Sequence, residues 1–161
     1  MAIQVGDRIP QATLHLMTDN GPAPVTTEEL FSGKRVVLFG LPGAFTPTCS
    51  AAHLPGYVVH ADEILNKGVN AIVCVSVNDA FVMDAWGKTQ NVDDKVMMVA
   101  DGNGEFTQAL GLELDLTGRG LGVRSQRYAM IVEDGVVKHI NIEDSPGKAE
   151  KSSAETTLGL L

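Results

Sequence analysis

The feature that most restricts the fold of this sequence is a near-continuous apolar run, Ala71–Val77. Such a run is typical of a β-strand covered on both faces, because a half-exposed strand alternates apolar and polar residues. A second, shorter run, Val36–Phe39, has the same character. The segment between them ends at Gly68 and carries apolar residues at helical spacing, namely Leu54, Val58, Ala61 and Leu65. A buried strand, a helix and a second buried strand predict an α/β sheet with parallel strands.

The remaining segments continue this alternation of strands and helices. Thr26 and Glu29 form a capping box that opens a short helix, and Asp134-Gly135 marks a two-residue hairpin turn. We expect the other elements in this order: a strand or hairpin within residues 3–25, a helix capped by Asn78 or Asp79, a strand at Val96–Ala100, a short helix near 106–110, a Gly-rich connection at Leu112–Ser125, hairpin strands at Tyr128–Val132 and Val136–Ile142, and a last helix capped by Ser152. This order predicts one α/β domain over residues 1–161, with a central mixed sheet flanked by helices.

The composition narrows the class of protein. A chain of 161 residues with 44% apolar content is large enough for one domain with a buried core. The net charge of −8, without a cluster of Lys and Arg, argues against a nucleic-acid or anionic membrane partner. No apolar run approaches the roughly 20 residues of a membrane span, and the N-terminal residues lack the features of a signal peptide. Because two cysteines cannot form a disulfide framework, we expect a cytoplasmic protein.

The segment Gly40–Cys49, which reads Gly-Leu-Pro-Gly-Ala-Phe-Thr-Pro-Thr-Cys, carries most of the functional information. It follows a buried strand, at the edge where open α/β sheets place their ligands. Thr46 and Pro47 suit the N-cap and the first position of a helix. Cys49 would then lie in the first helical turn, where unpaired N–H groups and the helix dipole favour an anion. We therefore expect Cys49 to be a nucleophile rather than a structural thiol.

A nucleophilic cysteine has to be ionised, because the thiolate is the reactive form. A free cysteine, with a pKa of about 8.5, is only about 3% ionised at pH 7. Raising this fraction to about 90% takes about 3.4 kcal/mol, whereas a helix N-terminus supplies about 0.3–2 kcal/mol. The sequence therefore predicts a cation near Cys49 from elsewhere in the chain. Thr46 stands where a Cys-x-x-Cys motif has its other cysteine, so dithiol exchange at this turn is excluded.

The motif Pro42-x-x-x-Thr46-x-x-Cys49 resembles the active-site signature of the peroxiredoxins. Its continuation, Ser50 followed by His53-Leu54-Pro55-Gly56, resembles the type II, or peroxiredoxin-5-like, branch of that family. Further similar segments follow in order along nearly the whole chain, namely Val5-Gly6-Asp7, Glu29–Lys34, Ser76–Val82 and Arg127-Tyr128.

This resemblance implies a thioredoxin-like fold and a thiol peroxidase that reduces hydrogen peroxide and alkyl hydroperoxides through a sulfenic acid on Cys49. It implies that Thr46 holds the peroxide, that Arg127 stabilises the thiolate and polarises the O–O bond, and that Pro42 shields the sulfur. It also implies recycling by glutathione with glutaredoxin, or by thioredoxin, and a homodimer. No metal, haem or nucleotide cofactor is implied.

Three residues each keep two interpretations. Cys74 is either a small core residue or a resolving cysteine that traps oxidised Cys49 in a disulfide, as the second cysteine on this strand does in some type II members. His53 is either a packed or capping residue, or a base or donor that supports the catalytic groups. The residues alone leave Arg119, Arg124 and Arg127 open as the cation, and the resemblance favours Arg127. Arg124 is the second candidate, or else a solvated arginine at the entry to a strand.

Two other functions remain open at this stage. A thioredoxin-fold redox sensor or chaperone would use Cys49 without turnover. A cysteine hydrolase or acyl transferase would need a histidine base, and His53 is the only nearby candidate. Steady consumption of peroxide with a thiol donor separates the peroxidase from both.

Overall fold

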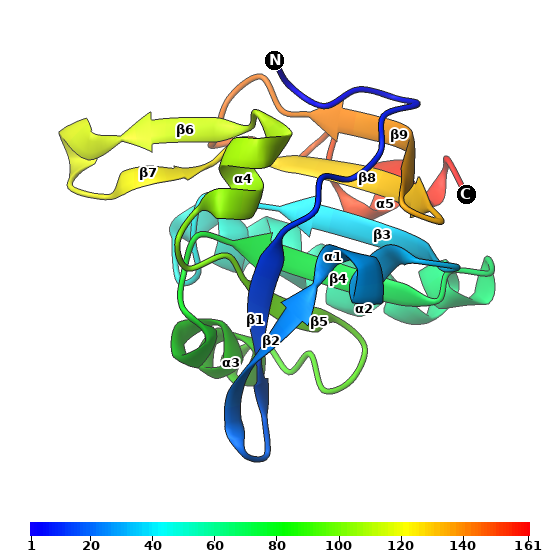
Figure 1. Cartoon of the computed structure of the whole chain (residues 1–161), viewed down its shortest axis with the longest axis horizontal. Helices are drawn as coiled ribbons and strands as arrows, with labels where there is room; N and C mark the ends of the chain where they lie inside the picture. The colour runs from blue at the N-terminus through cyan, green and yellow to red at the C-terminus, as the bar shows by residue number, and fades with distance from the viewer.

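The computed structural model describes residues 1–161 and contains a seven-stranded sheet in the order β2-β1-β5-β4-β3-β8-β9 (Figure 1). Strands β3, β4 and β5 are parallel, whereas β8 pairs antiparallel with both β3 and β9. The predicted central mixed sheet is therefore confirmed. The strands are β1 (Thr13–Thr18), β2 (Gly21–Thr26), β3 (Arg35–Gly40), β4 (Ala71–Ser76), β5 (Met97–Ala100), β8 (Tyr128–Glu133) and β9 (Val136–Ile142).

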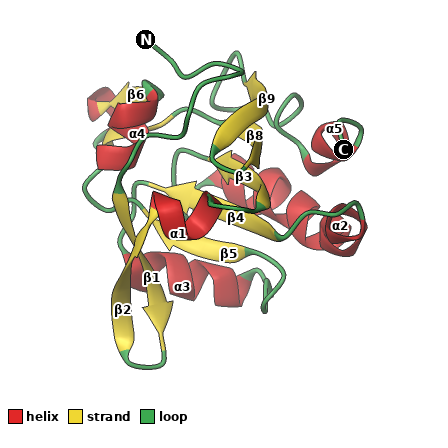
Figure 2. Ribbon diagram, turned by 45° about the vertical axis from the view of Figure 1, so that its right-hand side comes forward, coloured by secondary structure: helices red, strands yellow, loops and turns green.

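Helices cover both faces of this sheet (Figure 2). On one face α1 and α4 pack through Leu30 and Phe106, and on the other α2, α3 and α5 pack through Tyr57, Trp86 and Ala154. The fold is thus a three-layer α/β arrangement with a separate apolar core on each side of the sheet. The helices are α1 (Thr27–Phe31), α2 (Leu54–Asn66), α3 (Ala80–Thr89), α4 (Glu105–Leu110) and α5 (Ala154–Leu158). None of them combines the length and the apolar character that crossing a bilayer requires.

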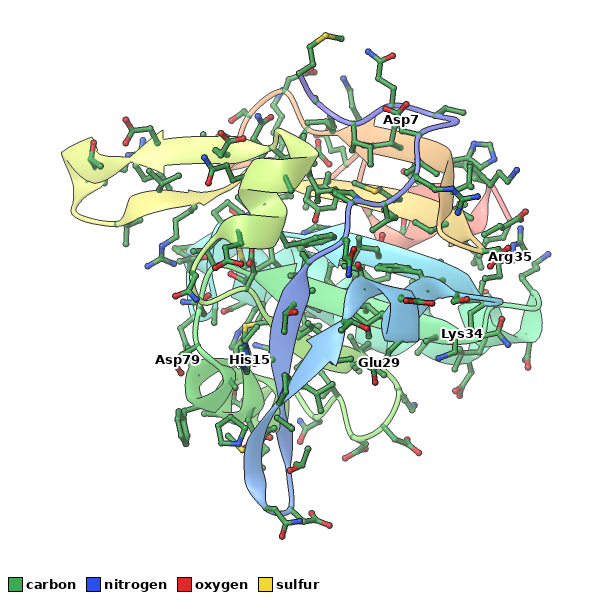
Figure 3. The ribbon with its side chains drawn as sticks, in the orientation of Figure 1. Asp7, His15, Glu29, Lys34, Arg35 and Asp79 are labelled. Atoms are coloured by element: carbon green, nitrogen blue, oxygen red, sulfur yellow. The ribbon has the colours of Figure 1, made fainter.

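The carboxyl ends of the parallel strands mark one end of the molecule. Figure 3 shows Arg35, at the start of β3, far from Asp79, which follows the end of β4. The loop of residues 41–48 lies at the Asp79 end, because the N–H of Ala44 donates to Asn78 Oδ1 at 2.9 Å. The cysteine that follows this loop therefore emerges where parallel α/β sheets bind their ligands.

The prediction that Leu112–Ser125 is only a Gly-rich connection is wrong. Strands β6 (Glu113–Leu116) and β7 (Gly122–Ser125) pair antiparallel as a second, two-stranded sheet, joined through a 3₁₀ turn at Thr117–Arg119. Gly120 and Gly122 have φ values of 73° and 67°, which glycine adopts without a steric cost. The glycines thus form the turn of a hairpin that extends beside α4 (Figure 1).

The prediction that Ser152 caps the last helix is also wrong, by one residue. The N-cap is Ser153, whose Oγ accepts a hydrogen bond from the N–H of Thr156 at 3.2 Å. Ser152 is buried instead, and its N–H and Oγ donate to Glu143 Oε2 at 2.7 and 2.6 Å. The buried side chain of Ser152 is directed at the Glu143 carboxylate and not at the first N–H groups of α5, so Ser153 provides the cap.

Candidate active site

Cys49 begins a π-helical turn, Cys49–His53, that runs directly into α2. Helical hydrogen bonding starts just before it, because the N–H of Ser50 donates to the carbonyl of Thr46 at 3.0 Å. The N–H of Leu54 then donates to the Cys49 carbonyl, five residues earlier. The π turn thus ends just before Pro55, which has no N–H to continue an α-helical ladder.

Arg127, which directly precedes β8, points its guanidinium at Cys49. Its Nη2 donates to the Cys49 sulfur at 3.1 Å, and the two residues are 2% and 0% exposed. None of the ion pairs in the structure involves Arg127. Its Nε and Nη2 donate instead to the carbonyl of Pro146, at 3.1 and 3.0 Å. A buried cation is costly unless an anion faces it, and the Cys49 thiolate is the group placed to be that anion.

His53 contacts the same guanidinium. Arg127 Nη1 donates to His53 Nδ1 at 2.9 Å, which assigns the ring hydrogen to Nε2, and Nε2 donates to the Ser152 carbonyl at 3.0 Å. Burial, and then the charge of Arg127, lowers the pKa of His53 to about 3. His53 is therefore neutral, and neither ring nitrogen is free to take a proton from Cys49. This arrangement fits a supporting residue and not the base of a hydrolase.

The hydroxyl of Thr46 is used differently from the expectation. Thr46 Oγ1 donates to the carbonyl of Gly43 at 2.6 Å and caps no helical N–H. Because its hydrogen is engaged, this oxygen can only accept a further hydrogen bond. The N–H of Cys49 has no hydrogen-bond partner within the protein. A free acceptor and a free donor therefore stand at the start of the helix that carries the sulfur, as the binding of a hydroxyl-bearing molecule requires.

Pro42 and Arg124 meet on the loop before the helix. Pro42 is buried, and its carbonyl accepts a hydrogen bond from Arg124 Nη1 at 3.2 Å. Arg124 Nε donates to the carbonyl of Leu121 at 2.9 Å, and a Cβ on Gly43 would lie 2.5 Å from Arg124 Nη1. Arg124 thus packs against the backbone of the loop and makes no hydrogen bond to Cys49. Of the two candidate cations, the structure places Arg127 at the sulfur.

The sequence and the fold are shared with known proteins. The Redoxin family model matches residues 4–158. Chloroplastic peroxiredoxin-2E of Arabidopsis thaliana is 52% identical over 164 residues, covering 99% of this chain and 70% of that protein. Peroxiredoxin-2B of the same plant is 49% identical over 160 residues, covering 99% and 98%. The crystal structure of reduced Prx3 in complex with H₂O₂ from Vibrio vulnificus has a TM-score of 0.93 at 55% identity, covering 98% of each chain. The chain belongs to the peroxiredoxins.

The relatives assign this peroxiredoxin to the type II branch. It is therefore a thiol peroxidase, an enzyme that reduces a peroxide with electrons from a thiol. The family, the thioredoxin-like fold and the enzyme class predicted from the sequence are confirmed.

Cys74 of this peroxiredoxin lies in the middle of β4, in register with Phe39 of β3 and Met98 of β5. It is fully buried, and its thiol is free, as is that of Cys49. Burial, and then the charge of Cys49, raises the pKa of Cys74 well above its ordinary value, against the opposing effect of Arg127. In this conformation of the peroxiredoxin, Cys74 is a protonated core thiol.

Two sets of contacts that hold the active-site loop of the peroxiredoxin were not predicted from the sequence. Asn78 binds the N–H of Ala44 at one end, and an asparagine directly after a buried strand was the available signal. At the other end, Trp86 Nε1 donates to Ser50 Oγ at 3.0 Å, and Gln90 Nε2 donates to the Ser50 carbonyl at 3.3 Å. These last contacts join α3 to the first turn of the active-site helix, and no local sequence pattern predicts them.

Proposed function

We propose that this peroxiredoxin reduces hydrogen peroxide and alkyl hydroperoxides by direct attack of the Cys49 thiolate, which Arg127 stabilises. The observation that carries the proposal is the 3.1 Å contact between Arg127 Nη2 and the Cys49 sulfur in a buried site. An arginine keeps its charge at every physiological pH, so it favours the thiolate in the resting enzyme. The same charge also favours the negative oxygen that develops as the peroxide bond breaks.

In the proposed chemistry the thiolate displaces an oxygen. The sulfur of Cys49 attacks the hydroxyl oxygen of HO–OR in line with the O–O bond. The S–O bond forms, the O–O bond breaks, and RO⁻ leaves with the electron pair and takes a proton from solvent. The products are a sulfenic acid on Cys49 and water or an alcohol.

The other residues of the site align the peroxide for this attack. Thr46 Oγ1 accepts the hydroxyl hydrogen of the peroxide, and the free N–H of Cys49 donates to one of its oxygens. Holding the O–O bond in line with the sulfur converts an encounter in solution into a reaction within one complex. Pro42, which is buried in the loop, shields the sulfur from bulk water.

Two external thiols complete the proposed cycle. The first condenses with the sulfenic acid, releasing water and leaving a mixed disulfide on Cys49. The second attacks that disulfide and releases the Cys49 thiolate. We propose glutathione with glutaredoxin, or thioredoxin, as the donor, in the cytoplasm. The burial and raised pKa of Cys74 favour an external donor over Cys74 in the resting conformation.

We also propose that the enzyme is a homodimer. The support is the exposure of apolar side chains on the elements around the active-site loop, with Phe45, Phe81 and Val123 exposed by 55%, 65% and 53%. Phe81→Glu should then shift the molecular mass measured by light scattering from dimer to monomer. A monomeric mass for the unmodified protein would contradict this proposal.

A single-turnover experiment tests the peroxidase mechanism. One equivalent of peroxide should add the mass of one oxygen atom to the protein, located on Cys49. Cys74→Ser should retain this first oxidation, whereas Cys49→Ser should lose it. Steady consumption of peroxide with a thiol donor distinguishes the enzyme from a sensor or chaperone that reacts once. Rapid peroxide reduction by Cys49→Ser would overturn the mechanism.

A further inference from the structure

The connection between β9 and α5 folds back on itself over Arg127. We call residues 143–152 the strap. Its two ends meet where Glu143 Oε2 accepts hydrogen bonds from the N–H and the Oγ of Ser152, at 2.7 and 2.6 Å. The next pair along the strap, Asp144 and Lys151, forms an exposed ion pair with 2.9 Å between Oδ2 and Nζ. Glu143 and Ser152 are 8% and 0% exposed, so their contact is buried, whereas the ion pair between Asp144 and Lys151 is exposed.

Two backbone carbonyls of the strap reach the active site. The Pro146 carbonyl accepts hydrogen bonds from Nε and Nη2 of Arg127, and Nη2 is also the nitrogen that donates to Cys49. The Ser152 carbonyl accepts from His53 Nε2 at 3.0 Å and from Tyr57 Oη at 2.7 Å. His53 in turn contacts Arg127 Nη1. The strap thus fixes the guanidinium both directly and through His53.

The chemistry of these contacts matters as much as their positions. A carboxylate beside Arg127 would hold the guanidinium but would also neutralise it, which would lower its effect on the thiolate. Carbonyl oxygens hold it without adding a negative charge. Glu143 is the nearest strand neighbour of Arg127, since its N–H donates to the Arg127 carbonyl at 2.9 Å. Its carboxylate nevertheless turns to Ser152, and no ion pair joins it to Arg127.

From this arrangement we infer that Glu143 is a positioning residue of the peroxidase site. By binding the N–H and the hydroxyl of Ser152, it closes the strap and aims the Ser152 carbonyl at His53 and the Pro146 carbonyl at Arg127. The guanidinium is thereby held against the Cys49 sulfur, and no carboxylate neutralises its charge. The inference rests on the proposed role of Arg127 and adds to it a residue that touches neither the sulfur nor the peroxide.

The test compares Glu143→Ala with Asp144→Ala, which removes only the exposed ion pair at the same strap. The rate of single-turnover oxidation by hydrogen peroxide and the pH midpoint of Cys49 alkylation are measured in a Cys74→Ser background, on protein shown to be folded by circular dichroism. We expect Glu143→Ala to slow oxidation by about tenfold to a hundredfold, since displacing a reacting group by about 1 Å costs up to about 10²-fold. The midpoint should move to higher pH. Asp144→Ala should match the parent protein, and Glu143→Gln, which keeps an acceptor oxygen, should recover much of the rate.

Combination with Arg127→Ala separates positioning from general stability. If Glu143 acts through the guanidinium, Glu143→Ala should cost nothing further in rate once Arg127 is alanine. A full additional loss in the double variant, or a folded Glu143→Ala with parental rate and midpoint, would overturn the inference. If Arg127→Ala moves the midpoint and Glu143→Ala does not, only the role of Glu143 fails. If neither moves it, the proposed role of Arg127 fails as well.

If Glu143→Ala does not fold, the Ser152→Ala variant tests the inference in its place. It removes the hydroxyl bond to Glu143 and keeps the backbone one. A slower oxidation with a midpoint at higher pH supports the inference, and parental values overturn it.

Discussion

The guanidinium of Arg127 lies 3.1 Å from the Cys49 sulfur and forms an ion pair with no carboxylate. Its other partners are neutral, namely the ring of His53 and the carbonyl of Pro146. A buried cation whose partners are all neutral stabilises a nearby anion more strongly than a buried cation that is already paired with a carboxylate. Under the proposed mechanism, the arginine and the cysteine act as one unit, in which the positive charge of Arg127 stabilises the Cys49 thiolate.

Arg127→Ala is expected to move the pH midpoint of Cys49 alkylation upward and to slow peroxide attack by about 10²–10³-fold, a loss typical of one aligned donor to a developing charge. The midpoint is read from iodoacetamide rates against pH in a Cys74→Ser background, so that one thiol reports. Arg127→Lys should recover only part of the rate, because an ammonium lacks the planar fork that contacts Cys49 and His53 together.

The matched control for this prediction is Arg124→Ala. Arg124 donates only to the carbonyls of Leu121 and Pro42, so its loss should loosen the loop while leaving the alkylation midpoint near the parental value. Equal displacement of the midpoint in both variants, or none in Arg127→Ala, would contradict the assignment of the cation.

Thr46→Val should slow peroxide reduction by about 10²-fold while leaving the alkylation midpoint nearly unchanged. Valine has nearly the shape of threonine but no oxygen to accept the peroxide hydrogen, so the loss falls on alignment rather than on ionisation. Thr46→Ser should restore most of the rate. The control is Thr48→Val, whose hydroxyl makes only a 3.4 Å contact with the Gly147 carbonyl. A displaced midpoint in Thr46→Val would show that its hydroxyl acts on the sulfur.

His53 should make the enzyme sensitive to acid. Burial and the charge of Arg127 lower its pKa from 6.5 to about 3. Between these two pH values, His53 binds a proton in the unfolded chain but stays neutral in the folded protein. This difference has no effect on stability above about pH 6.5. From there toward pH 3, the free energy of unfolding falls by up to about 1.4 kcal/mol for each pH unit. Urea unfolding at several pH values measures this slope. His53→Gln should flatten it, whereas His139→Gln, at an exposed position on β9, should not.

A disulfide between Cys49 and Cys74, if peroxide produces one, should require unwinding of residues 46–54. Cys74 is held in register between β3 and β5, and a disulfide needs its two Cα atoms within about 7 Å. The opening is local, so it costs less than global unfolding. The oxidised form should exchange amides faster over residues 46–54, and excess peroxide should convert Cys49 to sulfinic acid. Hydrogen exchange and intact mass measure both.

Trp86→Phe provides the comparison for this opening. It removes the indole hydrogen bond to Ser50 and should therefore speed disulfide formation. A disulfide that forms without any loss of protection over residues 46–54 would contradict the opening. Complete absence of the disulfide would make Cys74 a core residue and the protein a one-cysteine enzyme.

Much of the fold could be predicted because its signals are local. The apolar run at Ala71–Val77 contains strand β4, Ala71–Ser76, and Thr26 with Glu29 forms the predicted capping box. Asp134-Gly135 forms the predicted hairpin turn, with φ values of 47° and 77° that suit a two-residue turn. Each of these patterns lies within a few residues, so it indicates the local structure without information about the rest of the molecule.

The contacts that complete the site were not predictable in the same way. The resemblance to a family points to Arg127, whereas the residues alone leave Arg119, Arg124 and Arg127 open as the cation. Asn78 lies 34 residues from Ala44, and His53 lies 99 residues from Ser152. The competition that takes Ser152 from the helix cap depends on a carboxylate nine residues away. Pairings of this kind are decided by the packed fold, where two side chains meet that no short pattern connects.

The complete burial of the Cys49 sulfur sets the order of events in each catalytic cycle. Under the proposed mechanism, we expect a peroxide to reach the sulfur through small side-chain movements, whereas a thiol on another protein needs the first helical turn to open. The two substrates are therefore admitted by different conformations and never together, which gives steady-state rates of the substituted-enzyme type. With a protein thiol as donor, we expect the frequency with which that turn opens to set an upper limit on turnover at saturating peroxide. That limit would depend on the start of the helix and would be the same for every peroxide that the enzyme reduces.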